Sequence, residues 1–222
     1  MSIGRFGQVV TAPDLRLDAA CLAMSSAIQR PLDELEWLTT LDLLAAECPS
    51  DDVDGVARYL FGDLGFHGNA TAYYDWRNSC LDRVIQTHVG IPISLSVLMI
   101  EVARRVGVRL VGVAMPAHFL VRTVDGPVRF FDPFGAGVEL DRQGARELFE
   151  TVTRGQVPWS DTFLRPTFAQ PIIVRMLNNL RAIFQSRTDE LRLGIVMEMR
   201  ARIPQLAEAE RDEIDWATAV FN

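Results

Sequence analysis

The sequence predicts an α+β fold, with helices on both sides of one short strand-rich segment. An apolar run at 91–100 has the length and composition of a buried helix. Three short runs follow at 109–115, 118–124 and 128–131, and their apolar residues alternate or are continuous, as in strands. Helical spacing of apolar residues dominates the rest of the chain. We therefore expect a mixed core with a helical N-terminal cap and a helical C-terminal tail.

Composition and charge exclude several classes of function. Of the 222 residues 49% are hydrophobic and 23% charged, the profile of a globular protein that buries a sizeable core. The formal net charge of −7 argues against nonspecific binding to nucleic acid. All 22 basic residues are arginine, which excludes lysine Schiff-base chemistry and a phosphate-binding lysine. We expect no cofactor.

The cysteines and the apolar runs predict a protein of the cytoplasm. Cys21, Cys48 and Cys80 are far apart and form no paired motif, so we expect reduced thiols. The N-terminal residues do not have the basic start and apolar centre of a secretory leader. The run 91–100 is shorter than the roughly 20 residues that span a bilayer, so we expect no membrane association.

The N-terminal segment is predicted to be a small helical bundle. Residues 1–13 are expected to form a loose arm. Apolar residues have helical spacing at 14–24 and again after Pro31, where acidic residues follow the proline as they do at a helix start. A third helix is expected at 52–61, and these helices together would cap the core.

An aromatic cluster precedes the central helix. Glycines break the chain near residues 65–69, and Tyr73, Tyr74 and Trp76 follow within a few residues. Such a cluster can line a groove, or it can cover one end of the core. Asn78 is placed to cap the next helix, expected at 80–87.

The central segment is predicted to bring a histidine and an aspartate together. Ser94 can cap a buried helix that ends near Gly107. His118 lies on the second expected strand, and Asp132 comes directly after the third. Asp-Gly at 125–126 is a hairpin turn signal between these two strands, which would place the two side chains beside each other. A surface helix is expected at 141–153.

The C-terminal segment is predicted to be a helical tail. Pro171 opens a strongly amphipathic stretch, and short turns separate it from two further helical stretches. We expect the helices at 172–187, 191–202 and 208–221. Part of a helical repeat array cannot fold alone, so the tail should pack on the preceding domain. The predicted division is a domain at 1–165 and a tail at 166–222.

Four segments resemble the SirB-type transglutaminase-like family, at 60–108, 115–122, 130–137 and 173–184. The resemblance covers roughly residues 30–215. It implies a transglutaminase-like, that is papain-like, core followed by tetratricopeptide-like helices, of which this sequence has a shortened set. One departure is Ala117, where the family usually has glycine before the histidine.

The resemblance also places a proline at the nucleophile position. Members that are catalytic have Gly-x-Cys at the start of the central helix, a glycine about 15 residues later, then a His-aromatic strand and an Asp-Pro pair. Gly90 and Pro92 match the first motif, and Gly107 is 107 − 92 = 15 residues further on. His118 and Asp132 match the last two motifs. Since Pro92 has no nucleophilic group, we do not expect cysteine-dependent transglutaminase or protease activity.

Two other side chains could supply a nucleophile. Ser94 could complete a Ser-His-Asp arrangement with His118 and Asp132, or it could only cap the helix. Cys80 could fold back toward His118, or it could be a small buried hydrophobic residue. The His118–Asp132 pair could be kept for binding, or as a satisfied polar pair inside the structure.

The sequence thus favours a non-catalytic protein that binds a peptide or protein partner or has a regulatory role. The alternative is a hydrolase or acyl transferase that uses Ser94, His118 and Asp132. Regulation or scaffolding through the helical tail is a third possibility. His67 and His88 have no further ligands at metal-binding spacing, so no metal site is expected. The candidate binding residues are Tyr73, Tyr74, Trp76, Asn78 and Arg122. The oligomeric state is left open.

Overall fold

The computed structural model describes residues 2–204 and 206 and has an antiparallel sheet of five strands in the order β6-β5-β4-β3-β7. The strands are β3 (Leu110–Val113), β4 (Leu120–Thr123), β5 (Phe130–Asp132), β6 (Val138–Leu140) and β7 (Pro166–Thr167). In the register of β4 and β5, Val121 is opposite Phe131. The predicted α+β class is therefore confirmed.

The connection from β4 to β5 is a loop over 124–129, longer than a two-residue hairpin turn. Gly126 has a φ of +70°, which suits the Asp-Gly turn expected there. Thr123 closes the loop, because its hydroxyl donates to the Pro127 carbonyl at 2.8 Å and accepts from the Arg129 N–H at 3.1 Å. The loop thus fixes the positions of both strands relative to each other.

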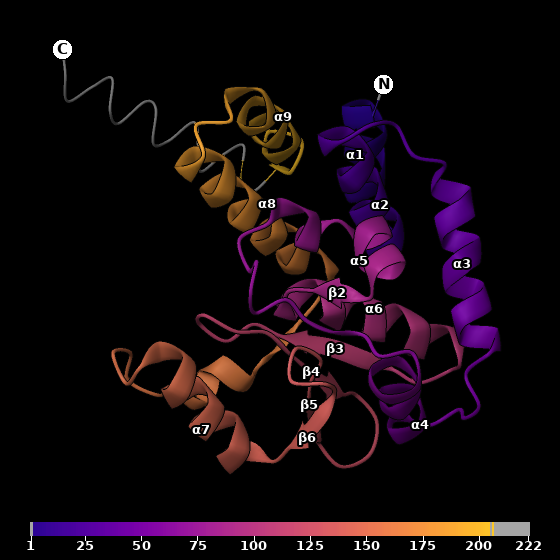
Figure 1. Cartoon of the computed structure of the whole chain (residues 1–222), viewed down its shortest axis with the longest axis vertical. Coiled ribbons are helices and arrows are strands. Elements are labelled where there is room, and N and C mark those ends of the chain that lie inside the picture. Colours follow the sequence, from indigo (N-terminus) through magenta and orange to yellow (C-terminus); the bar gives the residue numbers. More distant parts are fainter. Residues whose placement is uncertain (1, 205, 207–222) are drawn as a thin grey trace.

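The central helix α6 (Pro92–Arg105) is almost entirely buried. It packs on β3 and β4, and it also contacts α2 (Leu17–Ile28), α3 (Glu34–Ala46) and α5 (Leu81–Thr87). Figure 1 shows α6 between the sheet and the helices of the N-terminal half. A helix that is apolar on nearly all faces needs this surrounding cover.

The N-terminal segment forms further helices and one short strand pair. Residues 2–10 were expected to be a loose arm, but they form helix α1, because Phe6, Val9 and Val10 are buried against the rest of the core. The remaining elements are α1 (Ser2–Val10), α4 (Val53–Ala57), the π-helical turn η1 (Arg58–Asp63), β1 (His67–Gly68), the 3-10 turn η2 (Trp76–Ser79) and β2 (Val89–Gly90). Strands β1 and β2 pair in parallel.

The C-terminal segment shares the main core with the N-terminal helices. Helices α8 (Ala169–Ser186) and α9 (Glu190–Arg200) both contact α2, and α9 also contacts α1 (Figure 1). Strand β7, at the start of the predicted tail, pairs with β3 and so completes the sheet. The helix expected at 208–221 lies outside the described residues. The division at residue 165 stays a prediction.

Different helices pack on the two faces of the sheet. Phe119, Val121 and Phe131 belong to the main core with α2, α6 and α8. Leu120 and Phe130 face a smaller cluster formed with α7 (Arg142–Thr153) and the 3-10 turn η3 (Asp161–Leu164). Within the described part of the chain, no helix has the length and apolar character needed to cross a membrane.

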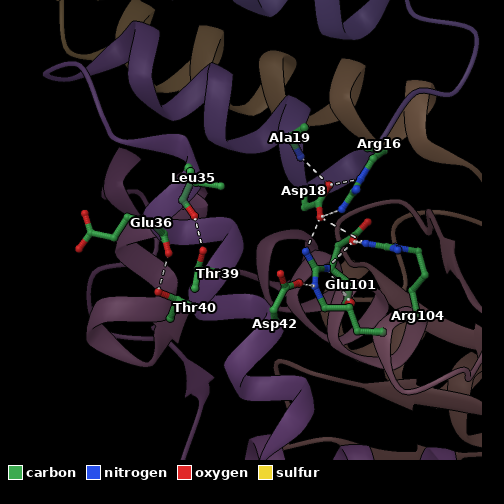
Figure 2. A network of polar contacts seen from close by, with 11 residues as sticks. Arg16, Asp18, Ala19, Leu35, Glu36, Thr39, Thr40, Asp42, Glu101 and Arg104 are labelled. Carbon is green, nitrogen blue, oxygen red and sulfur yellow. Dashed lines mark hydrogen bonds and ion pairs between the residues drawn. The ribbon is translucent and has the colours of Figure 1, made fainter.

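A buried ion cluster joins α2 to α6 (Figure 2). The Asp18 side chain is fully buried, and Arg105 donates to its carboxylate at 2.6 Å. Glu101, almost as buried, accepts from Arg104 at 2.8 Å and from Arg105 at 2.9 Å. At the edge of the cluster the exposed Asp42 of α3 accepts from Arg105 at 2.7 Å. Charges taken out of water need this kind of pairing.

Candidate functional site

The structure joins His118 to Asp132. His118 lies just before β4, Asp132 ends β5, and Nε2 of the imidazole is 2.9 Å from Oδ1 of the carboxylate. The same oxygen accepts from the backbone N–H of Phe134 at 3.1 Å. Both side chains are at least nine-tenths buried. The distance agrees with the pairing expected from the hairpin, and an aspartate in this position holds the imidazole in one orientation.

Ala117 has an unusual backbone conformation next to the pair. Its φ is +61°, in the left-handed region that glycine enters freely and alanine only at a cost. This gives a physical reason for the glycine that the resemblance places there. The turn directs the chain into β4 with His118 turned toward Asp132.

Pro92 and His118 line the same cavity, which has a volume of about 100 Å³. Pro92 is the first residue of α6, a position where its missing N–H and fixed φ are favourable. The cavity is lined by Tyr73, Ile91, Pro92, Ile93, Ala117, His118, Phe119, Arg175 and Asn179. The position that the resemblance gives to the nucleophile is therefore beside the histidine, but it holds a pyrrolidine ring.

Ser94 forms its hydrogen bonds away from the histidine. Its hydroxyl donates to the Asn78 carbonyl at 2.6 Å and accepts from the Ile91 N–H at 3.1 Å. Helix α6 begins two residues before Ser94, so the serine lies within the first turn and Ile91 is the capping residue. No hydrogen bond joins Ser94 to His118 in the described structure. This geometry gives the Ser-His-Asp alternative no support.

The three cysteines are not part of the cavity lining. Cys21 and Cys80 are fully buried, and burial raises the pKa of Cys80 to about 12 and that of Cys21 well above its usual value. Cys48 is half-buried, with its Sγ 3.2 Å from the carbonyl oxygen of Ser50. A thiol becomes a good nucleophile when its pKa is lowered, and the two buried thiols have the opposite shift.

An apolar groove adjoins the cavity. Its volume is about 390 Å³, and it lies between the loop before η2 and helix α8. It is lined by Tyr73, Tyr74, Ile91, Asn179, Ala182, Ile183 and Ser186. Tyr73, Ile91 and Asn179 also line the cavity, so the two spaces are neighbours with a shared wall. Tyr73 packs edge-to-face against Tyr74 there.

The predicted binding residues separate into two groups. Tyr73 and Tyr74 line the groove, whereas Trp76 is buried and packs near Phe184 of α8. Asn78 is buried as well, and its amide donates to the carbonyl of Ala72 at 2.8 Å. It therefore holds the loop that carries the two tyrosines.

Arg122 lies on the other face of the sheet. It donates to the Leu164 carbonyl at 3.3 Å, and its guanidinium lies over the ring of Phe130. His67 and His88 each bond a backbone carbonyl, of Gly65 and of Leu64 respectively. Among the described residues, no group of three or more His, Cys, Asp or Glu side chains could hold a metal ion.

Two residues of the site were missed in the sequence. Arg175 and Asn179 of α8 line the cavity, although α8 belongs to the segment read only as a helical tail. A partial signal was present, because Arg175 and Asn179 are four positions apart and so lie on the same side of the helix. Whether Arg175 and Asn179 line a cavity depends on where α8 packs.

Comparison with known proteins identifies relatives of this chain. A UPF0162 protein of Xylella fastidiosa is 39% identical over 176 residues, which are 78% of this chain and 60% of that protein. A UPF0162 protein of Pseudomonas aeruginosa is 28% identical over 162 residues, 73% of this chain and 59% of that protein. F-box only protein 21 of Mus musculus is 35% identical over 107 residues, 44% of this chain and 17% of that protein.

The chain spans about 60% of the length of the bacterial relatives that it matches at 38–39% identity. No solved structure matches it. A family model described as the transglutaminase-like superfamily matches residues 17–178, which run from α2 through the sheet into α8. The matched region contains the His118–Asp132 pair and Pro92. Because this model covers more than half of the chain, the protein belongs to the transglutaminase-like superfamily.

Proposed function

We propose that this protein is a non-catalytic member of the superfamily that binds a peptide or protein partner. One observation carries the proposal: Pro92 stands beside His118 at the helix start, where the chemistry needs a nucleophile. The histidine keeps its aspartate partner, but no thiol or hydroxyl of the described residues bonds to it. A cavity without a nucleophile retains the capacity to bind.

The groove supports a binding role. Its lining combines the rings of Tyr73 and Tyr74 with the aliphatic side chains of Ile91 and Ile183. Pockets of a few hundred Å³ with apolar walls and a few polar groups are the usual form of ligand sites. Tyrosine is also enriched where proteins bind one another, because it buries a large ring at low entropic cost.

The relatives fit a module with a binding role. The segment similar to F-box only protein 21 makes up 17% of that protein, so the similar sequence is part of a larger chain there. We also propose that the chain is of the SirB type, with tetratricopeptide-like helices after the core, on the four sequence segments given above. A cytoplasmic location is proposed too, supported by the free thiols of Cys21, Cys48 and Cys80.

The activity test compares the parent protein with Cys80→Ala, Ser94→Ala and Pro92→Cys. Substrates are p-nitrophenyl acetate and a glutamine-containing peptide with an amine acceptor. We expect no turnover by the parent above the buffer rate. Pro92→Cys tests whether position 92 suits a nucleophile. A thiol there, at the start of α6 and beside His118, should react with iodoacetamide faster than the native thiols.

Two results would contradict the proposal. Turnover by the parent that disappears on alkylation and in Cys80→Ala would show a cysteine enzyme. Turnover that survives both but is lost in Ser94→Ala would instead support the hydrolase or acyl transferase. Thermal unfolding of each variant shows whether a loss reflects chemistry or folding.

A further inference from the structure

An arginine without an acidic partner lines the cavity. Arg175 of α8 donates to the backbone carbonyl of His118 at 3.0 Å, and its guanidinium lies 5.8 Å from the ring centre of Phe119. It forms no ion pair with any carboxylate of the described residues. Burial lowers the pKa of Arg175, as expected for a guanidinium that loses water and gains no counter-ion.

Arg105, at the other end of α6, shows how a buried arginine is usually paired with carboxylates. The side chain of Arg105 is 8% exposed and has three carboxylate partners, on Asp18, Asp42 and Glu101. A half-buried guanidinium has five N–H donors to satisfy, and the described structure gives Arg175 one protein acceptor. The remaining donors are available to a group in the cavity.

Two other donors face the same space. Asn179 is one helical turn after Arg175 on α8, and its side-chain amide has no hydrogen-bond partner in the described part of the chain. The Tyr73 hydroxyl likewise has none there, and burial raises its pKa, so it remains a donor at neutral pH. Neither Asp nor Glu is among the lining residues. The cavity thus presents a positive charge and neutral donors without an acidic group.

The size of the cavity limits what can enter. Its volume of about 100 Å³ corresponds to about three waters at their liquid volume, which suits a carboxylate but not a continuing peptide chain. Ala117, His118 and Phe119 form one wall, and the shared residues Tyr73 and Asn179 lead to the larger groove. A chain lying in the groove can therefore place its end in the cavity.

We infer that the cavity binds the C-terminal carboxylate of a peptide, whose preceding apolar side chains lie in the groove beside Tyr73 and Tyr74. Arg175 supplies the charge and Asn179 a hydrogen bond, as charge-assisted donors do for carboxylates elsewhere. This inference rests on the proposed binding function and names the ligand class. No covalent step is involved.

The test uses three peptides and the whole protein. They are acetyl-Gly-Ser-Leu-Ala-Leu with a free carboxylate, the same peptide as its C-terminal amide, and acetyl-Gly-Ser-Leu-Asp-Leu amide. Isothermal titration calorimetry and saturation-transfer NMR, which detects weak complexes, measure binding. Because the amide loses the charge-assisted hydrogen bonds, the free carboxylate should bind at least about tenfold more tightly than either amide.

Two arginine variants on α8 form a matched pair. Arg175→Met removes the charge but keeps a stem over Phe119, and it should abolish the preference for the free carboxylate. Arg181→Met makes the same change on the same helix at a residue outside both linings, and it should keep the preference. Arg175→Lys keeps a positive charge but lacks the planar guanidinium that donates two parallel hydrogen bonds, so it should retain part of the preference for the free carboxylate. If Arg175→Met does not fold, Arg175→Lys and the three peptides still decide the question.

Each other outcome has a definite meaning. Equal binding of the free and amidated peptides by the parent overturns the carboxylate inference and leaves peptide binding in place. A preference for the free carboxylate that persists in Arg175→Met also overturns the carboxylate inference. Tight binding of the aspartate-containing amide overturns the C-terminal assignment in favour of an acidic side chain. Failure of all three peptides to bind overturns the inference, and the turnover measurements on the parent protein test the proposed function separately.

Discussion

At the scale of single residues, Pro92, Ser94 and Gly90 explain how the chain is built at the start of α6. Pro92 starts α6 favourably, at the position where the resemblance would place a nucleophile. Ser94, two residues later, uses its hydroxyl to tie the helix start to the carbonyl of Asn78. Gly90 is needed because a Cβ there would lie 2.8 Å from the Ser94 oxygen. The serine is thus part of a tight packing contact, and moving it toward His118 would break that contact.

Ala117 gives a prediction at this scale. Its φ of +61° is strained for an L-residue, so Ala117→Gly should raise the free energy of unfolding by about 0.5–1 kcal/mol, relief of strain exceeding the entropy that glycine loses. Ala72→Gly is the control: Ala72 is exposed and has no positive φ among the described residues, so the change should lower stability by up to about 1 kcal/mol. Chemical denaturation measures both. If Ala117→Gly were less stable than the parent, the backbone of Ala117 would not be strained.

At the scale of elements, the ion cluster links α2 to α6 through charged groups as well as apolar packing. Burial alone would raise the pKa of Asp18, but hydrogen bonds from Arg16, Arg105 and the Ala19 N–H outweigh it and lower the pKa to about 2. Burial, together with the charge of Asp18, raises the pKa of Glu101. The two acids share the same arginines, and of the two Asp18 has the lowered pKa (Figure 2).

Asp18→Asn should therefore cost stability in a pH-dependent way. The folded pKa of about 2 lies below the ordinary 3.8. Asp18 thus adds stability above pH 4, of about 2 kcal/mol by linkage, and this is lost as the pH falls from 4 to 2. The variant should be less stable by about 2–4 kcal/mol at pH 7, since a buried arginine loses a partner.

The matched control for this prediction is Asp42→Asn. Asp42 binds the same Arg105, but its side chain is 68% exposed, so the variant should lose less than about 1 kcal/mol. Urea titrations at pH 7 and between pH 2 and 4 measure both effects. The prediction would be wrong if the two variants lost equal stability. It would also be wrong if Asp18→Asn had the same dependence of stability on pH between 2 and 4 as the parent.

At the scale of the whole molecule, α8 belongs to the same core as α2. Met176 is fully buried with its Sδ 3.7 Å from the Cys21 Sγ, although the two residues are far apart in sequence. Contacts of this kind join the tail to the cap around α6. The site depends on them, because Arg175 and Asn179 of α8 line the same cavity as Pro92 of α6.

We expect that the tail does not unfold as an independent unit. Met176→Ala should lower the free energy of unfolding by about 2–4 kcal/mol and shift one single transition of the whole chain. Leu191→Ala, on the 76% exposed side chain of Leu191 in α9, should change it by less than about 0.5 kcal/mol. A fragment of residues 167–222 should be poorly helical by circular dichroism. A separate thermal transition for the tail would contradict this.

The sequence alone determined the elements whose signals are local. The apolar run of α6, the alternation in β4 and the helical period of α8 predicted these elements, because burial imposes a period of 3.6 or 2 on apolar residues. The Asp-Gly turn and the spacing of two strands were enough to bring His118 and Asp132 together. Motif spacing also predicts that Pro92 stands at the nucleophile position, and Pro92 does line the cavity of His118.

Tertiary structure decided what no local signal contains. Residues 2–10 space Phe6, Val9 and Val10 as an amphipathic helix does, but nothing in their own sequence specifies the distant partners that bury Phe6. The direction of the Ser94 hydroxyl depends on the Asn78 carbonyl, and the unpaired charge of Arg175 depends on which face of α8 meets the cavity. Hydrogen bonds and unpaired charges are fixed by the packing of segments far apart in the chain, so they follow from the folded arrangement and not from the order of residues.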